Sequence, residues 1–185
     1  MSPSEVETEQ LLLRRWREED KVPFAAMNSD PAVMEFFPAP LARAESDALV
    51  DRFDAELAER GFCPWAVELR ESGTFIGFIG LHAVPEYLSF APAVEVGWRL
   101  ARPFWGRGFA TEGAGGAVRF GFDVLELDEI VSFTSVVNLR SRRVMERLGM
   151  ARSPDEDFEH PHVPEAHPLR PHVLYRLSGD QWRAR

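Results

Sequence analysis

The chain has 185 residues, of which 45% are hydrophobic and 28% are charged, a composition typical of a folded globular protein. Its formal net charge of −9 argues against non-specific nucleic-acid binding and favours cationic partners such as amines. The sequence has no apolar run near the roughly 20 residues of a membrane helix, no secretory pattern at its start and a lone Cys63, which together predict a cytoplasmic protein.

The first half of the chain predicts two helices and four strands. One helix starts with the acidic turn 18–20 and is broken at 28–31, and a second runs over 44–60 and ends at Gly61. Between them, 33–40 is expected to be an apolar loop or a short helix. Strands are expected at 10–16, 64–69, 74–81 and 94–100, the second and third joined as a hairpin.

The strand 94–100 has a clear alternation. Its apolar members share one face: Val94, Val96, Trp98 and Leu100. Glu95, Gly97 and Arg99 share the other face. Glu95 therefore projects away from the apolar row.

The second half alternates helices with strands. A helix with an apolar stripe follows the glycine turn 106–108, and its internal glycines indicate close approach by a sheet or a ligand. A strand buried on both faces is expected at 129–136, then a helix capped by Asn138 that ends at Gly149, a loop at 153–171 and a strand at 172–177. This order predicts a mixed sheet covered by helices, within one domain spanning 1–185.

The glycine turn predicts an anion site, because a helix start offers unpaired N–H groups that glycines leave accessible. A dinucleotide site fits poorly, since Thr111 stands where the third glycine belongs and Asp128 precedes the next strand instead of ending it. A P-loop lacks its Gly-Lys-Ser/Thr. A tight turn without any ligand remains an alternative.

Ser141 falls on the inward stripe of the helix after Asn138, together with Val144, Met145 and Leu148. A hydroxyl there needs a partner. It either bonds back into its own helix or points at a ligand between the two helices.

The segments WGRGFATEG (105–113) and NLRSRRVMERLGM (138–150) resemble the coenzyme A-binding core of the GNAT acetyltransferases, most closely the ribosomal-protein N-acetyltransferases of the RimJ/RimL type. The resemblance extends through LRRWREED, NSDPAVMEFFP and EVGWRL, and so covers nearly the whole chain. It implies an α+β fold with a mostly antiparallel mixed sheet of about six or seven strands, splayed between the fourth and fifth and flanked by about four helices.

The resemblance also implies roles for residues. Asn138 contacts the pantetheine arm of acetyl-CoA, and Ser141 protonates the departing thiolate. The backbone at Val96 and Trp98 holds the acyl carbonyl. The pyrophosphate loop comprises Trp105, Gly106, Arg107, Gly108, Phe109, Ala110 and Thr111. Apart from the resemblance, Arg140, Arg142, Arg143 and Arg147 are expected chiefly on a solvated helix face, with a contact of Arg140 or Arg142 to the 3′-phosphate as the alternative.

Glu95 is the first candidate for the base that deprotonates the amine, with a solvated or ion-paired strand residue as the alternative. A water relay is a further possibility for the base. We expect the acceptor pocket to be lined by Phe36, Phe37, Trp65 and His160. The histidine-rich loop 153–171 lacks metal-ligand spacing, so no metal is expected. Cys63 is expected to be a small buried residue and not an acyl carrier.

These features predict an acetyl-CoA-dependent N-acetyltransferase that acts on a primary amine, either a peptide N-terminus or a small molecule, through a ternary complex. The alternatives are an enzyme with another acyl-CoA or an O-acceptor, and a catalytically silent acyl-CoA sensor. The sequence leaves the acceptor and the oligomeric state open, a homodimer being one option.

Overall fold

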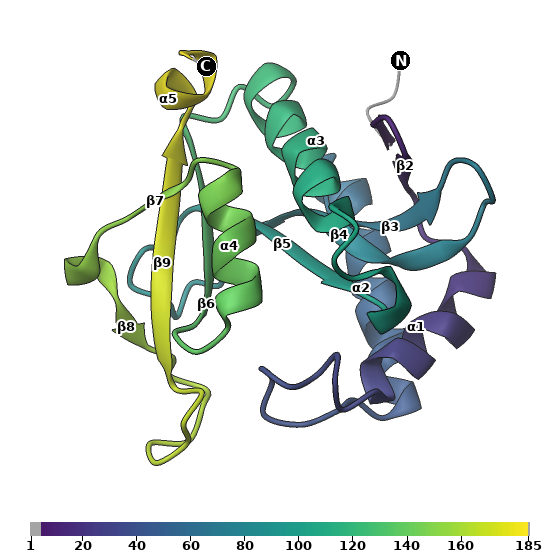
Figure 1. Ribbon diagram of the computed structural model, residues 1–185, viewed down its shortest axis with the longest axis horizontal. Helices are drawn as coiled ribbons and strands as arrows, with labels where there is room; N and C mark the ends of the chain where they lie inside the picture. Colours follow the sequence, from purple (N-terminus) through teal and green to yellow (C-terminus); the bar gives the residue numbers. More distant parts are fainter. Residues whose placement is uncertain (1–4, 185) are drawn as a thin grey trace.

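The computed structural model describes residues 5–184, and the strands in that range form one mixed sheet (Figure 1). The strands are β1 (Val6–Glu7), β2 (Leu11–Arg14), β3 (Pro64–Leu69), β4 (Phe75–Ala83), β5 (Val94–Leu100), β6 (Glu129–Ser135), β7 (Ala151–Arg152), β8 (Phe158–Glu159) and β9 (Pro171–Ser178). They lie in the order β1-β2-β3-β4-β5-β6-β9-β7, and β8 also pairs with β9. All pairs are antiparallel except β5 with β6, which is parallel.

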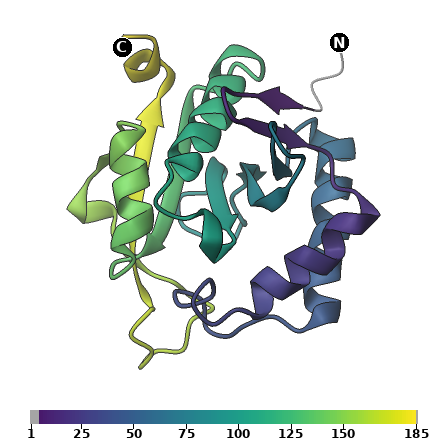
Figure 2. The same cartoon turned by 45° about the vertical axis from the view of Figure 1, so that its right-hand side comes forward.

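Helices cover both faces of this sheet. They are α1 (Lys21–Ser29), α2 (Arg43–Arg60), α3 (Phe109–Asp123), α4 (Leu139–Arg147) and the short α5 (Gly179–Arg183). The helices α3 and α4 pack on one face, whereas α1 and α2 lie side by side on the opposite face (Figures 1 and 2). The arrangement follows from the strand alternation, because each face of the sheet presents its own apolar row.

The hydrophobic core divides according to these faces. Trp65 and Phe120 meet edge to face at 5.3 Å between the sheet and α3. On the other face, Trp16 packs against Phe24 of α1 and Phe53 of α2, with ring centroids 4.8 and 5.9 Å away. A third cluster lies under the loop 84–93, against β6 and β9. Both faces of β6 are therefore buried, as predicted.

Glycines in α3 allow the helix to lie close to the sheet. A Cβ atom at Gly113 would come within 2.4 Å of Ile79 Cδ1, and one at Gly121 within 2.7 Å of Ile130 Cδ1. Real Cβ atoms do not approach so closely, so these positions accept only glycine without local rearrangement. The close approach inferred from the sequence is thus made by the sheet.

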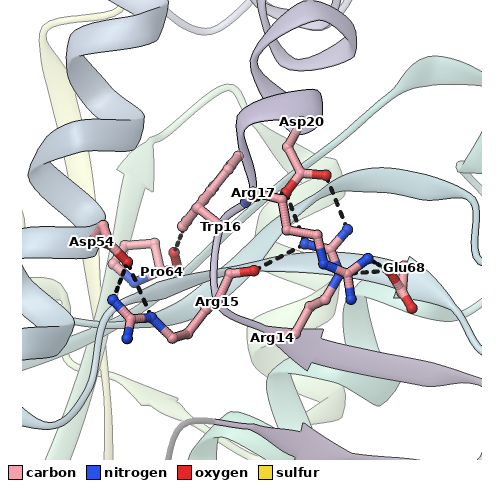
Figure 3. A network of polar contacts seen from close by, with 8 residues as sticks. All are labelled: Arg14, Arg15, Trp16, Arg17, Asp20, Asp54, Pro64 and Glu68. Carbon is pink, nitrogen blue, oxygen red and sulfur yellow. Dashed lines mark hydrogen bonds and ion pairs between the residues drawn. The ribbon is translucent and has the colours of Figure 1, made fainter.

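A buried ion-pair network joins β2 to β3 and to the turn before α1 (Figure 3). Arg14 donates to both oxygens of Asp20, at 2.7 and 2.9 Å, and to Glu68. Burial disfavours the charged guanidinium, but the hydrogen bonds to the two carboxylates outweigh burial and raise the pKa of Arg14. Nearby, the pair of Arg15 and Asp54 is exposed.

The α+β fold and its splayed sheet agree with the prediction. Within residues 5–184 the sheet has nine strands and not six or seven, because β1, β7 and β8 are two-residue strands too short to give a sequence pattern. The predicted loop 153–171 thus contains β8. The helix expected from Glu18 opens with a 3-10 turn over Glu18–Asp20, and 33–40 forms turns and no helix.

Candidate active site

The glycine turn joins β5 to α3 and is fixed by an indole. Trp105 Nε1 donates to the Leu100 carbonyl at 2.7 Å. Gly106 and Gly108 have φ values of 74° and 86°, which L side chains rarely adopt. A Cβ atom at either glycine would meet no atom within 4 Å, so the space in front of the turn is open to a ligand.

The start of α3 presents free amides at this turn. Its first backbone hydrogen bond runs from the Glu112 N–H to the Gly108 carbonyl, which leaves the N–H groups of 109–111 without helical acceptors. These donors and the helix dipole favour an anion.

A cleft of about 760 Å³ begins at this turn, passes between α3 and α4, and continues to the opposite face of β5. Most of the predicted site residues line this cleft: Phe36, Phe37, Glu95, Trp98, Trp105, Gly106, Gly108, Phe109, Ala110, Thr111, Asn138, Arg140, Ser141 and His160. The turn and the carboxylate on the far face of β5 therefore share one space.

The cleft passes through the sheet where β5 and β6 separate. These strands share a single register pair, Glu95 with Val131. Beyond it, the Ser132 hydroxyl donates to the Val96 carbonyl at 2.9 Å. Because backbone groups of alternate residues face the same side of a strand, the Trp98 N–H also faces this gap. The Val96 side chain is fully buried, which leaves only its backbone near the gap.

Glu95 pairs with a histidine that the sequence did not single out. His82 of β4 lies directly across from Glu95, and its Nε2 is 2.8 Å from Glu95 Oε2. Burial opposes protonation of His82, but the hydrogen bond and the charge of Glu95 outweigh it and raise the pKa of His82. A histidine paired with a carboxylate in this way is an arrangement that general acid–base catalysis can use.

Asn138 and Ser141 form a small network at the start of α4. Asn138 Oδ1 accepts from the Ser141 N–H at 3.2 Å, and its Nδ2 donates to Thr134 Oγ1 and to Ser141 Oγ at 3.0 and 3.1 Å. The amide of Asn138 thus has partners within the protein at its oxygen and at both donors. Since the Ser141 oxygen accepts from Asn138, its own hydrogen remains available for donation into the cleft.

Comparison with known proteins decides the family. The sequence profile of the acetyltransferase (GNAT) domain matches residues 10–151. The chain belongs to the GNAT acetyltransferase family. The uncharacterized N-acetyltransferase YnaD of Bacillus subtilis is 26% identical to this GNAT acetyltransferase over 178 residues, which are 96% of this chain and 98% of YnaD.

Solved structures agree on the fold. The crystal structure of a GNAT-family acetyltransferase from Bacillus anthracis has a TM-score of 0.80 at 22% identity and covers 95% of this chain and 99% of its own. Spermidine N-acetyltransferase from Vibrio cholerae, solved in complex with CoA and spermine, has a TM-score of 0.73 at 18% identity. The match covers 94% of this chain and 98% of the Vibrio cholerae chain. The GNAT acetyltransferase therefore has the fold of its family.

The arginines of α4 in the acetyltransferase differ from the prediction in which of their side chains line the cleft. Arg142 does not line the cleft, because it donates to the Val136 carbonyl and to the Tyr175 hydroxyl, at 3.0 and 3.4 Å. Of the two arginines predicted to meet the 3′-phosphate, Arg140 thus lines the cleft and Arg142 does not. Arg143 and Arg147, which the sequence placed on a solvated face, line the cleft. Their spacing of four residues on one helix face was the signal that could have grouped them.

Arg140 connects α4 to the segment 30–42. Its guanidinium pairs with Glu35 and lies over the rings of Phe36 and Trp105, at 5.1 and 4.6 Å from their centroids. The Arg107 side chain lies over Phe109 at 4.7 Å and is exposed outside the cleft lining, so only the backbone of Arg107, which the prediction named as the donor, belongs to the turn.

Trp65 is not part of the acceptor pocket. Its side chain is fully buried against α3 and does not line the cleft. The prediction for Trp65 is wrong, because the alternation of β3 turns it towards the core together with Val67. Cys63 is also fully buried, and burial raises the pKa of its thiol, so no thiolate is exposed to the cleft.

His160 joins an aromatic wall at the acceptor side of the cleft. Its ring lies 4.9 Å from His172, which in turn lies 5.5 Å from Phe158. Burial lowers the pKa of His160 and of His172, so both rings are neutral near pH 7 and the wall is uncharged. Among residues 5–184, no group of three His, Cys, Asp or Glu side chains is arranged to hold a metal ion. In the same range, no helix is both long and apolar enough to cross a membrane.

Proposed function

We propose that the acetyltransferase transfers an acetyl group from acetyl-CoA directly to a primary amine, with both substrates bound together. The observation that carries this proposal is the shared cleft: the free amides of the glycine turn and the Glu95–His82 pair open onto one space. Direct transfer fits because Cys63, the lone cysteine, is buried away from the cleft and offers no acyl-accepting thiolate.

The residues around the glycine turn fit a coenzyme A pyrophosphate. Gly106 and Gly108 leave room for phosphates, and the amides of 109–111 supply donors. Arg143 and Arg147 add positive charge on the α4 side. The CoA-bound state of the Vibrio cholerae relative supports this assignment by analogy of fold.

Acetyl-CoA supplies a thioester carbonyl, at which the amine nitrogen forms the new C–N bond while the C–S bond breaks. The ammonium form of the acceptor must first lose a proton. The Glu95–His82 pair takes up that proton as a unit when His82 is neutral. Glu95 Oε1 lies 3.8 Å from the Cβ position of Gly97, so this oxygen faces the open floor of the cleft and receives the proton.

Two groups stabilise the negative charges that develop on the carbonyl oxygen and on the departing sulfur. The Trp98 N–H faces the gap between β5 and β6 and is placed to donate to the carbonyl oxygen as negative charge develops on it. The Ser141 hydroxyl, oriented by Asn138, donates its proton to the coenzyme A thiolate and takes up in exchange the proton that the attacking nitrogen loses as the amide forms.

Within the family, the RimJ/RimL-like motifs favour a peptide N-terminus or a small-molecule amine as acceptor, in one domain spanning 1–185. An acyl-CoA other than acetyl-CoA, an O-acceptor and a silent acyl-CoA sensor are the competing functions.

Calorimetry and thiol release test the proposal together. We expect acetyl-CoA to bind, and free coenzyme A thiol to appear when amines or peptides are added. Binding without thiol release across the panel would favour the sensor. Failure to bind any acyl-CoA would refute the proposal.

A further inference from the structure

Arg99 is a cleft arginine without a carboxylate. Its Nη1 donates to Asn28 Oδ1 at 2.7 Å, and its guanidinium lies over Phe37 and Phe78 at 4.2 and 5.4 Å from their ring centroids. Within residues 5–184 no acidic group forms an ion pair with Arg99, and its buried Nε has no hydrogen-bond partner. Burial, with no carboxylate to oppose it, lowers the pKa of Arg99 to about 10.

Arg14, which is buried, is a natural comparison for the half-buried Arg99. Arg14 uses its donors on two carboxylates, Asp20 and Glu68 (Figure 3). A guanidinium shielded from water without an anion is costly, so such a group is more common at a site than in a scaffold. The side of Arg99 that carries Nε and Nη2 is the planar edge that binds a carboxylate through two parallel hydrogen bonds.

Arg99 shares one face of β5 with Glu95 and Gly97. The Cα atoms of Glu95 and Arg99 are separated by four residues of strand, about 13 Å. Gly97 lies between them without a side chain, so the floor of the cleft is open from the negative end to the positive end. The site has an acidic pair for an ammonium group at one end and a cation for an anion at the other.

We infer that the acceptor is an amino acid or a short peptide whose carboxylate docks on Arg99 while its amine lies at Glu95. This inference rests on the proposed acetyl transfer and names its acceptor class. The net charge of −9, taken alone, favoured cationic acceptors, but Arg99 gives the site a local positive charge that favours an acceptor with a carboxylate. Phe37, which is 40% exposed and covers the guanidinium, has to turn aside to admit the carboxylate.

Matched acceptors test the inference with the unaltered protein. Thiol release is measured with ω-amino acids from glycine to aminohexanoate, with the carboxamide of each and with the corresponding alkylamine. We expect kcat/KM to be roughly 10- to 100-fold higher for the best amino acid than for its amide, as for a lost charged hydrogen bond. Equal or faster turnover of the amides would overturn the inference while leaving the acetyltransferase proposal intact.

Arg99→Met should remove the discrimination, so that the ratio of amino acid to amide falls towards one. Arg60→Met, at an exposed arginine at the end of α2, should keep the ratio of the wild type. Circular dichroism and calorimetry with CoA establish that the Arg99 variant is folded. A folded Arg99→Met protein that retains the full ratio would overturn the inference.

Equilibrium binding separates the two proposals. The best amino acid and its amide are titrated by calorimetry into the protein saturated with CoA. Preferential binding of the amino acid without any acetyl transfer would support the role of Arg99 and refute the proposed function. Equal binding of both ligands would refute the role of Arg99.

Discussion

Replacing Glu95 with glutamine tests the acid–base pair most directly. Glutamine has the shape of glutamate and can still hydrogen-bond His82, so the substitution removes mainly the charge. The Glu95 side chain is 12% exposed and lies 2.8 Å from His82. Loss of a positioned base typically costs 10²- to 10⁴-fold, or about 2.7–5.4 kcal/mol in the activation barrier, and we expect a decrease of kcat/KM in this range.

The pH profile gives the same variant a second readout. In the wild type, the rate should rise with pH as the pair loses its proton, because a raised pKa keeps His82 protonated to higher pH. Without the charge of Glu95, burial is the largest remaining influence and lowers the pKa of His82, so the inflection of kcat/KM should move to lower pH. Glu71→Gln, in an exposed turn, should leave rate and profile unchanged. Wild-type kcat/KM and an unmoved inflection in Glu95→Gln would refute the acid–base role.

Two further substitutions test the leaving-group site and the scaffold. Ser141→Ala should lower kcat about 100-fold, at the low end for acid catalysis because a thiolate leaves readily, while CoA affinity measured by calorimetry stays constant; an unchanged kcat would exclude the hydroxyl as the acid. Asp20→Asn should lower the free energy of unfolding in urea by about 3 kcal/mol, since it leaves Arg14 buried with Glu68 alone, whereas Asp54→Asn at the exposed pair with Arg15 should cost less than about 1 kcal/mol. Equal losses in the two aspartate variants would contradict this account.

The strand that divides the site could be predicted in detail. Alternation along 94–100 assigned Val96 to the core side and Glu95 to the other side, and both lie there in the structure. This succeeds because a strand has a strict period of two, so one well-placed apolar row fixes every side chain. The glycine turn is similarly local, since its positive φ values demand glycine.

The partners of these residues could not be predicted, because they come from other elements. His82 faces Glu95 through the register of β4 against β5, which depends on the conformation of the ten residues 84–93 between them. Arg99 meets Asn28 from α1, 71 positions away in the sequence. Helical spacing identified the apolar stripe of α4, but only the position of Tyr175 on β9 shows that Arg142 turns away from the cleft.

The tight contact between α3 and the sheet has a consequence for folding. Glycine costs a helix about 1 kcal/mol relative to alanine, and α3 contains several glycines. A peptide spanning 109–123 would therefore be largely unfolded in water. The amides at its start acquire their common direction only once the helix has docked on the sheet. Cofactor affinity and global stability are consequently linked, and a saturating cofactor should raise the melting temperature of the whole chain and not merely order a loop.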